Sequence, residues 1–140
     1  MDLKPELWHG KRVLVTGHTG FKGSWLTLLL NELGAKVVGL ALQAEKPQSL
    51  YEDAKIASLL DAEYIQDIRD SEKVGVVIDE ENVDYVFHLA AQALVRKSVR
   101  DPLESITTNV IGTANVLLSA LSYAGTPFNG MACGAPHGAG

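Results

Sequence analysis

The sequence predicts an α/β fold in which helices cover both faces of a doubly wound parallel sheet. Apolar, β-branched runs alternate with helical patterns in the order β-α-β-α-β-α-β-α, and such alternation is typical of a parallel sheet with right-handed crossovers. A glycine-rich loop joins the first strand to the first helix, which is where doubly wound folds bind phosphate groups. These observations predict a Rossmann-like sheet with strand order 3-2-1-4, truncated after about four strands.

The first strand and the first helix follow each other directly. Residues 12–17 (RVLVTG) form a nearly continuous apolar run, as expected of a strand buried on both faces. Residues 21–34 predict a helix that ends at Gly34. Its apolar residues recur at helical spacing: Trp25, Leu26, Leu29, Leu30 and Leu33. Residues 35–42 (AKVVGLAL) then predict a second buried strand.

The middle of the chain supplies two further helix–strand units. Residues 46–60 predict a helix with Ser49 as its cap, and residues 63–66 predict a short strand. Residues 71–82 predict an amphipathic helix whose inward positions are Val74, Val77 and Ile78. Residues 83–92 (VDYVFHLAAQ) read as a fourth apolar strand, which we expect to lie at the edge of the sheet.

The last third of the chain changes character near its end. Residues 101–125 predict one long helix, with Pro102 in its first turn and Gly112 inside it. Residues 126–140 are rich in glycine, alanine and proline and have no apolar period, so we expect a disordered or non-native tail. The predicted folded portion is therefore residues 1–125.

Composition and charge limit the possible functions. The 140 residues are 46% hydrophobic and 21% charged, which suits one globular domain. A net charge of −5 gives no support for binding to nucleic acid or to an acidic membrane surface. The lone Cys133 excludes an internal disulfide and a metal site built from several cysteines, and we expect no metal. No apolar stretch is long enough for a signal peptide or a membrane span, so the expected location is cytoplasmic.

The glycine loop GHTGFKG is the strongest functional signal. Gly17, Gly20 and Gly23 are spaced G-x-x-G-x-x-G between a strand and a helix. The amino-terminus of a helix offers free N–H groups to a phosphate, and glycine lets that phosphate approach closely. A nucleotide-binding P-loop is a weaker alternative, because Lys22 precedes Gly23 where that motif needs glycine and then lysine. Glycines that serve only a tight turn are the other alternative.

The loop and the second strand leave some details open. Lys22 either pairs with a pyrophosphate oxygen or is a solvated surface lysine, and His18 is interpreted as a neutral hydrogen-bonding residue. Selection of NAD usually needs an acidic residue at the end of the second strand. Residues 39–47 (GLALQAEKP) offer only Glu45, slightly late, and no arginine for a 2′-phosphate. NAD is mildly favoured, and NADP stays open.

Four motifs carry a resemblance to a known family. TGHTGFKG, DIRD, FHLAAQ and TNVIGTANVL occur in this order and resemble the extended short-chain dehydrogenase/reductase family. GHTGFKGSWL and AAQALVR resemble most the CDP-glucose 4,6-dehydratases within it, and the resemblance covers residues 8 to 124. It implies an NAD-dependent lyase that converts a nucleotide sugar, CDP-glucose, to CDP-4-keto-6-deoxyglucose.

The resemblance also implies a set of site residues. Asp67 would accept the adenine amino group with Ile68 beside the ring, although Asp67 also suits a helix cap. Asn109 would prop the active site, and Arg96 is either near the substrate or a surface arginine. His88 is interpreted as a packed strand histidine. The full cofactor-binding set is Gly17, Thr19, Gly20, Phe21, Lys22, Gly23, Asp67, Ile68, Leu89, Ala90, Ala91, Gln92 and Asn109.

The catalytic residues of that family are a Tyr-x-x-x-Lys pair on a later helix. This chain contains YEDAK, Tyr51 to Lys55, which we interpret as an exposed helix pair on the wrong side of the sheet. The true pair would fall beyond residue 140, so this chain itself is expected to be inactive. Two alternatives remain: a non-catalytic dinucleotide-binding module, and part of a nucleotide-sugar epimerase. A homo-oligomer is a possible assembly, since an apolar edge strand invites pairing with another chain.

Overall fold

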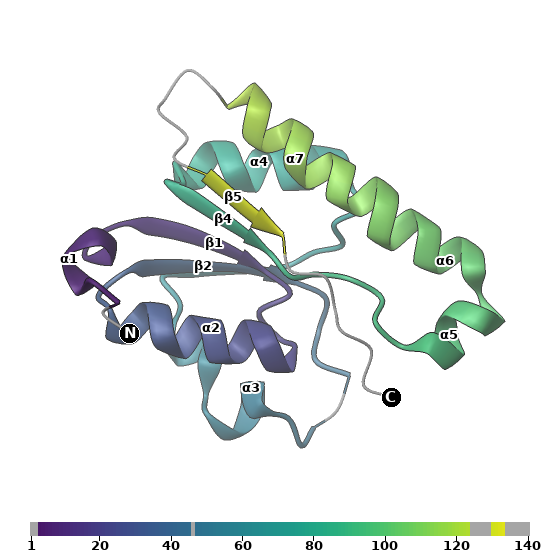
Figure 1. Ribbon diagram of the computed structural model, residues 1–140, viewed down its shortest axis with the longest axis horizontal. Coiled ribbons are helices and arrows are strands. Elements are labelled where there is room, and N and C mark those ends of the chain that lie inside the picture. Colours follow the sequence, from purple (N-terminus) through teal and green to yellow (C-terminus); the bar gives the residue numbers. More distant parts are fainter. Residues whose placement is uncertain (1–2, 46, 124–129, 134–140) are drawn as a thin grey trace.

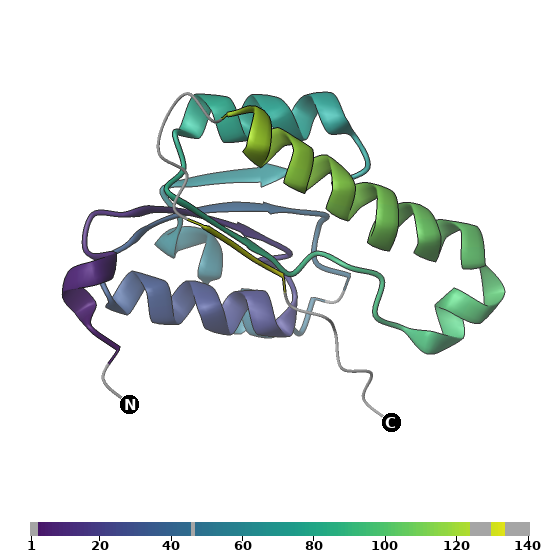
Figure 2. The same ribbon diagram turned by 45° about the horizontal axis from the view of Figure 1, so that its top comes forward.

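The computed structural model describes residues 3–45, 47–123 and 130–133, which form a parallel sheet between two layers of helices (Figures 1 and 2). The sheet has five strands in the order β3-β2-β1-β4-β5. Their bounds are β1 Arg12–Thr16, β2 Lys36–Ala41, β3 Ala62–Ile65, β4 Tyr85–His88 and β5 Gly130–Cys133. The predicted order 3-2-1-4 is confirmed, and one strand is added beyond β4.

Strand β5 corrects the prediction for the end of the chain. It pairs in parallel with β4, from Tyr85 opposite Gly130 to His88 opposite Cys133. The sheet is therefore not truncated after four strands, and β4 is not its edge. Three apolar residues among glycine, alanine and proline are too short a run to stand out in the sequence, and their pairing comes from a distant strand. The rest of 126–140 lies outside the described residues.

The core is divided between the two faces of the sheet. On β1, Leu14 faces α4 (Ser71–Glu81) and α7 (Thr113–Ser122), while Val13 and Val15 face α2 (Phe21–Glu32). Figure 1 shows α2 on one side of the sheet and the α4–α7 pair on the other. Because successive side chains of a strand point to opposite faces, a central strand covered on both faces is apolar at every position.

Helix α2 packs through small side chains together with Leu30 and Leu26, and not through all of its predicted apolar positions. The helix is confirmed, but Trp25 is 55% exposed and Leu29 is 40% exposed. Its buried residues are Gly23, Ser24, Thr27 and Leu30. The Thr27 hydroxyl donates to the Gly23 carbonyl at 2.8 Å, and the Ser24 hydroxyl donates to the His18 carbonyl at 3.0 Å. Small, internally bonded hydroxyls let the start of the helix lie close against the glycine loop.

Helix α4 follows the prediction closely. Val74, Val77 and Ile78 are buried, as predicted. The cap, however, is Asp70, whose side chain accepts the Lys73 N–H at 3.2 Å. The interpretation of Asp67 as the cap of this helix is therefore wrong.

Two predicted helices are divided in the structure. Residues 46–60 give α3 (Leu50–Asp53) and a 3₁₀ turn η1 (Ile56–Leu59), separated by Lys55 with a φ of 50°. Ser49 caps α3 by accepting the Glu52 N–H, as predicted. The chain between 95 and 122 gives α5 (Val95–Arg100), α6 (Pro102–Ile106), a π-helical segment η2 (Thr107–Gly112) and α7. α5 was not predicted, and both α5 and α6 lie beyond the carboxyl ends of the strands (Figure 1).

Large apolar side chains stay exposed along α5, α6, η2 and α7. The exposed set is Val95, Val99, Leu103, Ile106, Val110, Ile111, Leu117, Leu118 and Leu121. At the other end of the chain, α1 (Pro5–Trp8) brings Trp8 against β4, with ring centroids 5.3 Å from Tyr85 and 6.0 Å from Phe87. Across 3–45, 47–123 and 130–133, no helix combines the length and apolarity needed to cross a membrane.

Candidate functional site

The carboxyl ends of the central strands meet where the strand order reverses. Gly17, directly after β1, donates its N–H to the Leu40 carbonyl of β2 at 2.8 Å. Its φ is +77°, and a Cβ there would lie 2.7 Å from the Ala90 nitrogen, just after β4. The main chains of three strands therefore converge at Gly17. In doubly wound sheets, ligands bind in the crevice at this reversal.

The glycine loop then turns into α2. The Gly20 N–H bonds to the Gly17 carbonyl at 3.0 Å, and Gly20 caps the helix without any side-chain hydrogen bond. A Cβ on Gly23 would overlap the Gly17 carbonyl, whose carbon would be 2.7 Å away. A Cβ on Gly20 would meet only the Gly17 oxygen, at 3.3 Å. Gly23 thus serves close packing, while Gly20 is exposed and stands at the amino-terminus of the helix, whose first N–H groups have no partner within the helix.

The remaining loop residues face outward. The Thr19 hydroxyl donates to the Leu42 carbonyl at 2.9 Å and so ties the loop to the end of β2. Phe21 is 71% exposed and Lys22 is exposed. Lys22 forms no ion pair with any carboxylate in the part of the chain that the structure describes. Both open interpretations of Lys22 remain compatible with this position.

His18 is fully buried beneath the loop. Its Nε2 lies 2.7 Å from Glu63 Oε1, and its ring lies over Gly39, where an added Cβ would come within 2.7 Å. Burial lowers the pKa of His18, while the contact with Glu63 acts in the opposite direction. The Tyr51 hydroxyl donates to the same Glu63 oxygen at 2.6 Å. His18 is thus a buried hydrogen-bonding residue, and its partner on β3 was not predictable from the sequence.

Tyr51 and Lys55 do not form a catalytic arrangement. Helix α3 ends at Asp53, so Lys55 does not lie one turn along the same helix as Tyr51. Burial and the hydrogen bond to Glu63 raise the pKa of Tyr51 to about 12. A tyrosine that acts as a base needs a lowered pKa.

A buried hydrogen-bond chain runs through His88. The Thr16 hydroxyl accepts the Leu89 and Ala90 N–H groups at 3.1 and 3.2 Å and lies 2.7 Å from His88 Nδ1. On the other side, His88 Nε2 lies 2.9 Å from the Thr113 hydroxyl, which donates to the Asn109 carbonyl.

This series of hydrogen bonds determines which ring nitrogen of His88 carries the proton. The Thr16 hydroxyl has only its own proton left to give to Nδ1, and the Thr113 hydroxyl has already donated, so Nε2–H donates to it. The assignment is a neutral imidazole, and burial lowers the pKa of His88. His88 is buried as predicted, but Thr16 was missed, although a hydroxyl at the end of an apolar strand was the available signal.

Asn109 holds the segment that follows β4. Its side-chain Oδ1 accepts the Gln92 N–H at 2.7 Å, and its Nδ2 donates to the Gln92 carbonyl at 3.1 Å. Both bonds are made to the main chain of Gln92, as a neighbouring strand would make them. The π-helical segment that contains Asn109 therefore shapes the path of residues 89–92, which the sequence predicts to line the cofactor.

Replacing Asn109 by alanine should destabilise the protein by about 2 kcal/mol, because two partly buried main-chain groups lose their partners. Urea unfolding measures this change. Gln92→Ala is the matched control, since it keeps the main-chain groups that Asn109 binds. Equal losses of stability in the two variants would contradict the assigned role.

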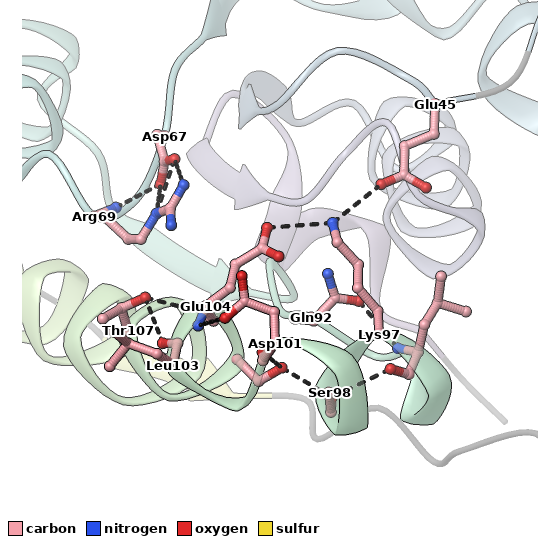
Figure 3. Close-up of polar contacts among 12 residues, drawn as sticks. Glu45, Asp67, Arg69, Gln92, Lys97, Ser98, Asp101, Leu103, Glu104 and Thr107 are labelled. Carbon is pink, nitrogen blue, oxygen red and sulfur yellow. Dashed lines mark hydrogen bonds and ion pairs between the residues drawn. The ribbon is translucent and has the colours of Figure 1, made fainter.

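Asp67 follows β3, and Figure 3 shows its carboxylate pointing toward Arg69. Its carboxylate binds the Arg69 guanidinium, with Oδ2 2.6 Å from the NH2 nitrogen, and this bond holds the pKa of Asp67 below its usual value. The carboxylate is therefore a charged acceptor, 30% exposed. Ile68 is buried in the core, and the Asn115 side chain holds the Ile68 carbonyl at 3.0 Å. The role of Ile68 beside an adenine ring stays a prediction.

A lysine links the segments that follow β2 and β4. Lys97 Nζ lies 3.2 Å from Glu104 Oε1 and 4.0 Å from Glu45 Oε1, as Figure 3 shows. The neighbouring Arg96 is exposed on α5. Lys97 was not predicted, because its partners are brought together only by the tertiary fold. No group of three His, Cys, Asp or Glu side chains within the described ranges could hold a metal ion.

Comparison with known proteins gives concordant matches. Residues 14–128 match the family described as GDP-mannose 4,6 dehydratase. The chain is 53% identical over 110 residues to the CDP-glucose 4,6-dehydratase of Salmonella typhimurium, covering 79% of this chain and 30% of that protein. It is 33% identical to the UDP-glucose 4-epimerase of Halalkalibacterium halodurans, with 79% and 31% covered.

Solved structures agree with these matches. The UDP-glucose-4-epimerase of Stenotrophomonas maltophila, solved with bound NAD and formylated UDP-arabinopyranose, superposes with a TM-score of 0.70 at 29% identity, covering 83% of this chain and 34% of that one. The Thermus thermophilus UDP-glucose 4-epimerase in complex with NAD gives 0.68 at 32% identity, with 80% and 34% covered. The chain spans about a third of the length of these relatives. On the match of residues 14–128, the chain belongs to the GDP-mannose 4,6-dehydratase family.

Proposed function

We propose that this chain is the NAD-binding part of a nucleotide-sugar 4,6-dehydratase that acts on CDP-glucose. The observation that carries the proposal is the amino-terminus of α2, which begins at the glycine loop, has no side-chain cap and lies at the reversal of strand order. The 53% identity to a CDP-glucose 4,6-dehydratase, against 33% to an epimerase, favours the dehydratase over the epimerase alternative.

The residues of the crevice fit a dinucleotide. The first-turn N–H groups of α2 suit a pyrophosphate, because the positive end of the helix dipole lies there. Asp67 is ionised and partly exposed, so it can accept a hydrogen bond from an adenine amino group. The main chain of Gly17 lies close to that of Ala90, just after β4. Ala90 and Ala91 have small side chains, so a ribose could lie against the main chain there.

Each part of the chain then has a defined task. When bound, NAD supplies a hydride acceptor. The glycine loop would hold the pyrophosphate, and Lys22 would place its charge beside it. Thr16, His88 and Thr113 would keep residues 89 and 90 in position through the buried hydrogen-bond chain. Asn109 would fix Gln92 at the nicotinamide end of the crevice.

We further propose that the chain binds the cofactor without turning over a sugar. YEDAK is its only Tyr-x-x-x-Lys sequence, and the tyrosine there has a raised pKa and no lysine one turn along the same helix. A non-catalytic dinucleotide-binding module is therefore the second candidate for the chain on its own. We propose in addition a nucleotide sugar as the substrate class and a homo-oligomer as the assembly.

Titration of NADH into the purified chain tests the proposed function. We expect saturable binding, followed by fluorescence of the reduced cofactor. Gly20→Val should weaken it at least about tenfold, because a branched side chain at the start of α2 would stand where the phosphate is proposed to approach the helix N–H groups. Gly75→Ala is the control: it lies on α4, where the added Cβ meets only Ser119 Oγ at 3.7 Å, and it should bind like the parent.

The outcomes separate clearly. Binding by the parent and by Gly75→Ala but not by a folded Gly20→Val chain supports the proposal. A folded parent chain that binds no NADH would overturn it. Formation of the keto sugar from CDP-glucose and NAD by the chain alone would overturn the second claim and leave the first standing.

A further inference from the structure

A cavity of about 440 Å³ lies beside the glycine loop, at the carboxyl ends of β2 and β3. Its wall includes Thr19, Tyr51 and three carboxylates, those of Glu45, Glu52 and Glu63. Thr19 belongs to the glycine loop, so the cavity continues directly from the crevice described above. The inference below rests on the proposed NAD site and concerns its adenosine end.

The usual determinant of NAD selectivity is missing from β2. Dinucleotide-binding folds commonly place an acidic residue at the end of the second strand, where it accepts the ribose 2′-hydroxyl. Here Ala41 and Leu42 occupy that end. The cavity wall instead carries three carboxylates from other elements: Glu45 from the loop after β2, Glu52 from α3 and Glu63 from β3.

Glu63 is the carboxylate that the fold holds in place. His18 Nε2 at 2.7 Å and the Tyr51 hydroxyl at 2.6 Å both bind its Oε1. Oε2 has no hydrogen-bond partner among the residues that the structure describes. Both donors are neutral near pH 7, since burial lowers the pKa of His18 and raises that of Tyr51. The negative charge of Glu63 therefore stays on the cavity wall.

The described wall holds no compensating cation. The ammonium of Lys97, which is not part of the wall, is shared between Glu104 at 3.2 Å and Glu45 at 4.0 Å. Lys97 thus faces Glu45 rather than Glu63 or Glu52. Lys46 lies outside the described residues. These carboxylates would repel a ligand group with two negative charges, whereas they would accept a hydrogen bond from a hydroxyl group.

We propose that Glu63, fixed by His18 and Tyr51, selects NAD by accepting the adenosine ribose 2′-hydroxyl and rejects NADP by repelling its 2′-phosphate. Selectivity of this kind needs both an attractive contact to one ligand and a repulsive one to the other. A fixed carboxylate supplies both, because a hydroxyl donates to it and a phosphate cannot. Selectivity for NAD then does not need an acidic residue at the end of β2, where this chain has none.

Parallel titrations with NADH and NADPH test the inference. The parent should bind NADH at least about tenfold more tightly than NADPH. Glu63→Gln keeps an acceptor oxygen for His18 and Tyr51 but removes the charge, so it should raise NADPH affinity and narrow this ratio. Glu52→Gln is the second variant, on an exposed side chain, and should act in the same direction. Glu80→Gln on α4 changes net charge equally, far from the cavity, and should leave the ratio unchanged.

Equal binding of NADH and NADPH by the parent would overturn the inference and leave the proposed NAD site intact. A folded Glu63→Gln chain that keeps the parent ratio, or a Glu80→Gln chain that shifts it equally, would also overturn it. If Glu63→Gln does not fold, the Glu52→Gln ratio decides. A folded parent that binds neither dinucleotide overturns the proposed function, and the inference falls with it.

Discussion

Replacing Gly23 by alanine is expected to destabilise the protein by about 3 kcal/mol or more, enough to unfold much of a marginally stable domain. The added Cβ would overlap the Gly17 carbonyl, and this neighbour is main chain that cannot rotate aside. Relief requires α2 to move away from the loop, which breaks its packing against the sheet. Thermal unfolding followed by circular dichroism measures the loss.

Gly75→Ala is the matched control for this change. Gly75 is also a helical glycine, but its added Cβ would make an ordinary contact with Ser119 Oγ at 3.7 Å. Alanine there should stabilise the protein by about 0.5–1 kcal/mol, because glycine weakens a helix interior. Similar melting temperatures for Gly23→Ala and the parent would show that the loop and helix are less tightly packed than described.

Acid should weaken the fold below pH 6.5 through His88. Burial lowers the pKa of His88 from its ordinary value of 6.5, so the folded protein holds this imidazole neutral while the unfolded chain protonates it. Since the unfolded state binds more protons, stability rises with pH in this range and is lost as pH falls below 6.5. Between pH 7.5 and 5.5 the loss is at most about 1.4 kcal/mol from this one group.

The measurement is urea unfolding at the two pH values. His88→Gln should lose less stability between pH 7.5 and 5.5 than the parent does, whatever its absolute stability. A direct check is the proton resonance of the His88 ring, which should titrate in the folded protein at a lower pH than an ordinary imidazole, because burial lowers the pKa of His88. A ring that titrates at its ordinary pKa would refute the neutral hydrogen-bond chain through Thr16 and Thr113. His18 shares the direction of shift, but Glu63 beside it would stabilise its charged form.

The central sheet was predictable because its strands are continuous apolar runs next to clear turn signals. Strands β1 and β2 and the buried face of α4 follow directly from residue type and spacing. Helix α2 was predicted, yet its packing face was not, since Gly23, Ser24 and Thr27 carry no apolar signal. Strand β5 was missed because four residues gain their structure from pairing with β4, a contact that local sequence does not encode.

In the candidate site, too, some features were predictable from the sequence and others were not. The glycine spacing predicted the loop, and chemistry alone assigned a phosphate to it. Partners far apart in sequence were not predictable: Thr16 with His88 and Thr113, Glu63 with His18 and Tyr51, Lys97 with Glu45. Each depends on a distance set by the assembled sheet.

The packing of Trp8 against Tyr85 and Phe87 makes the fluorescence of Trp8 a reporter of folding. The indole meets these rings only after the amino-terminal turn and β4 have come together, a separation of more than 70 residues. Its ultraviolet emission therefore depends on the finished sheet, whereas Trp25 stays largely in water on the outer side of α2. With Trp25 replaced by phenylalanine, the emission of the single remaining tryptophan would distinguish a chain that has formed only helices from one that has also assembled its sheet.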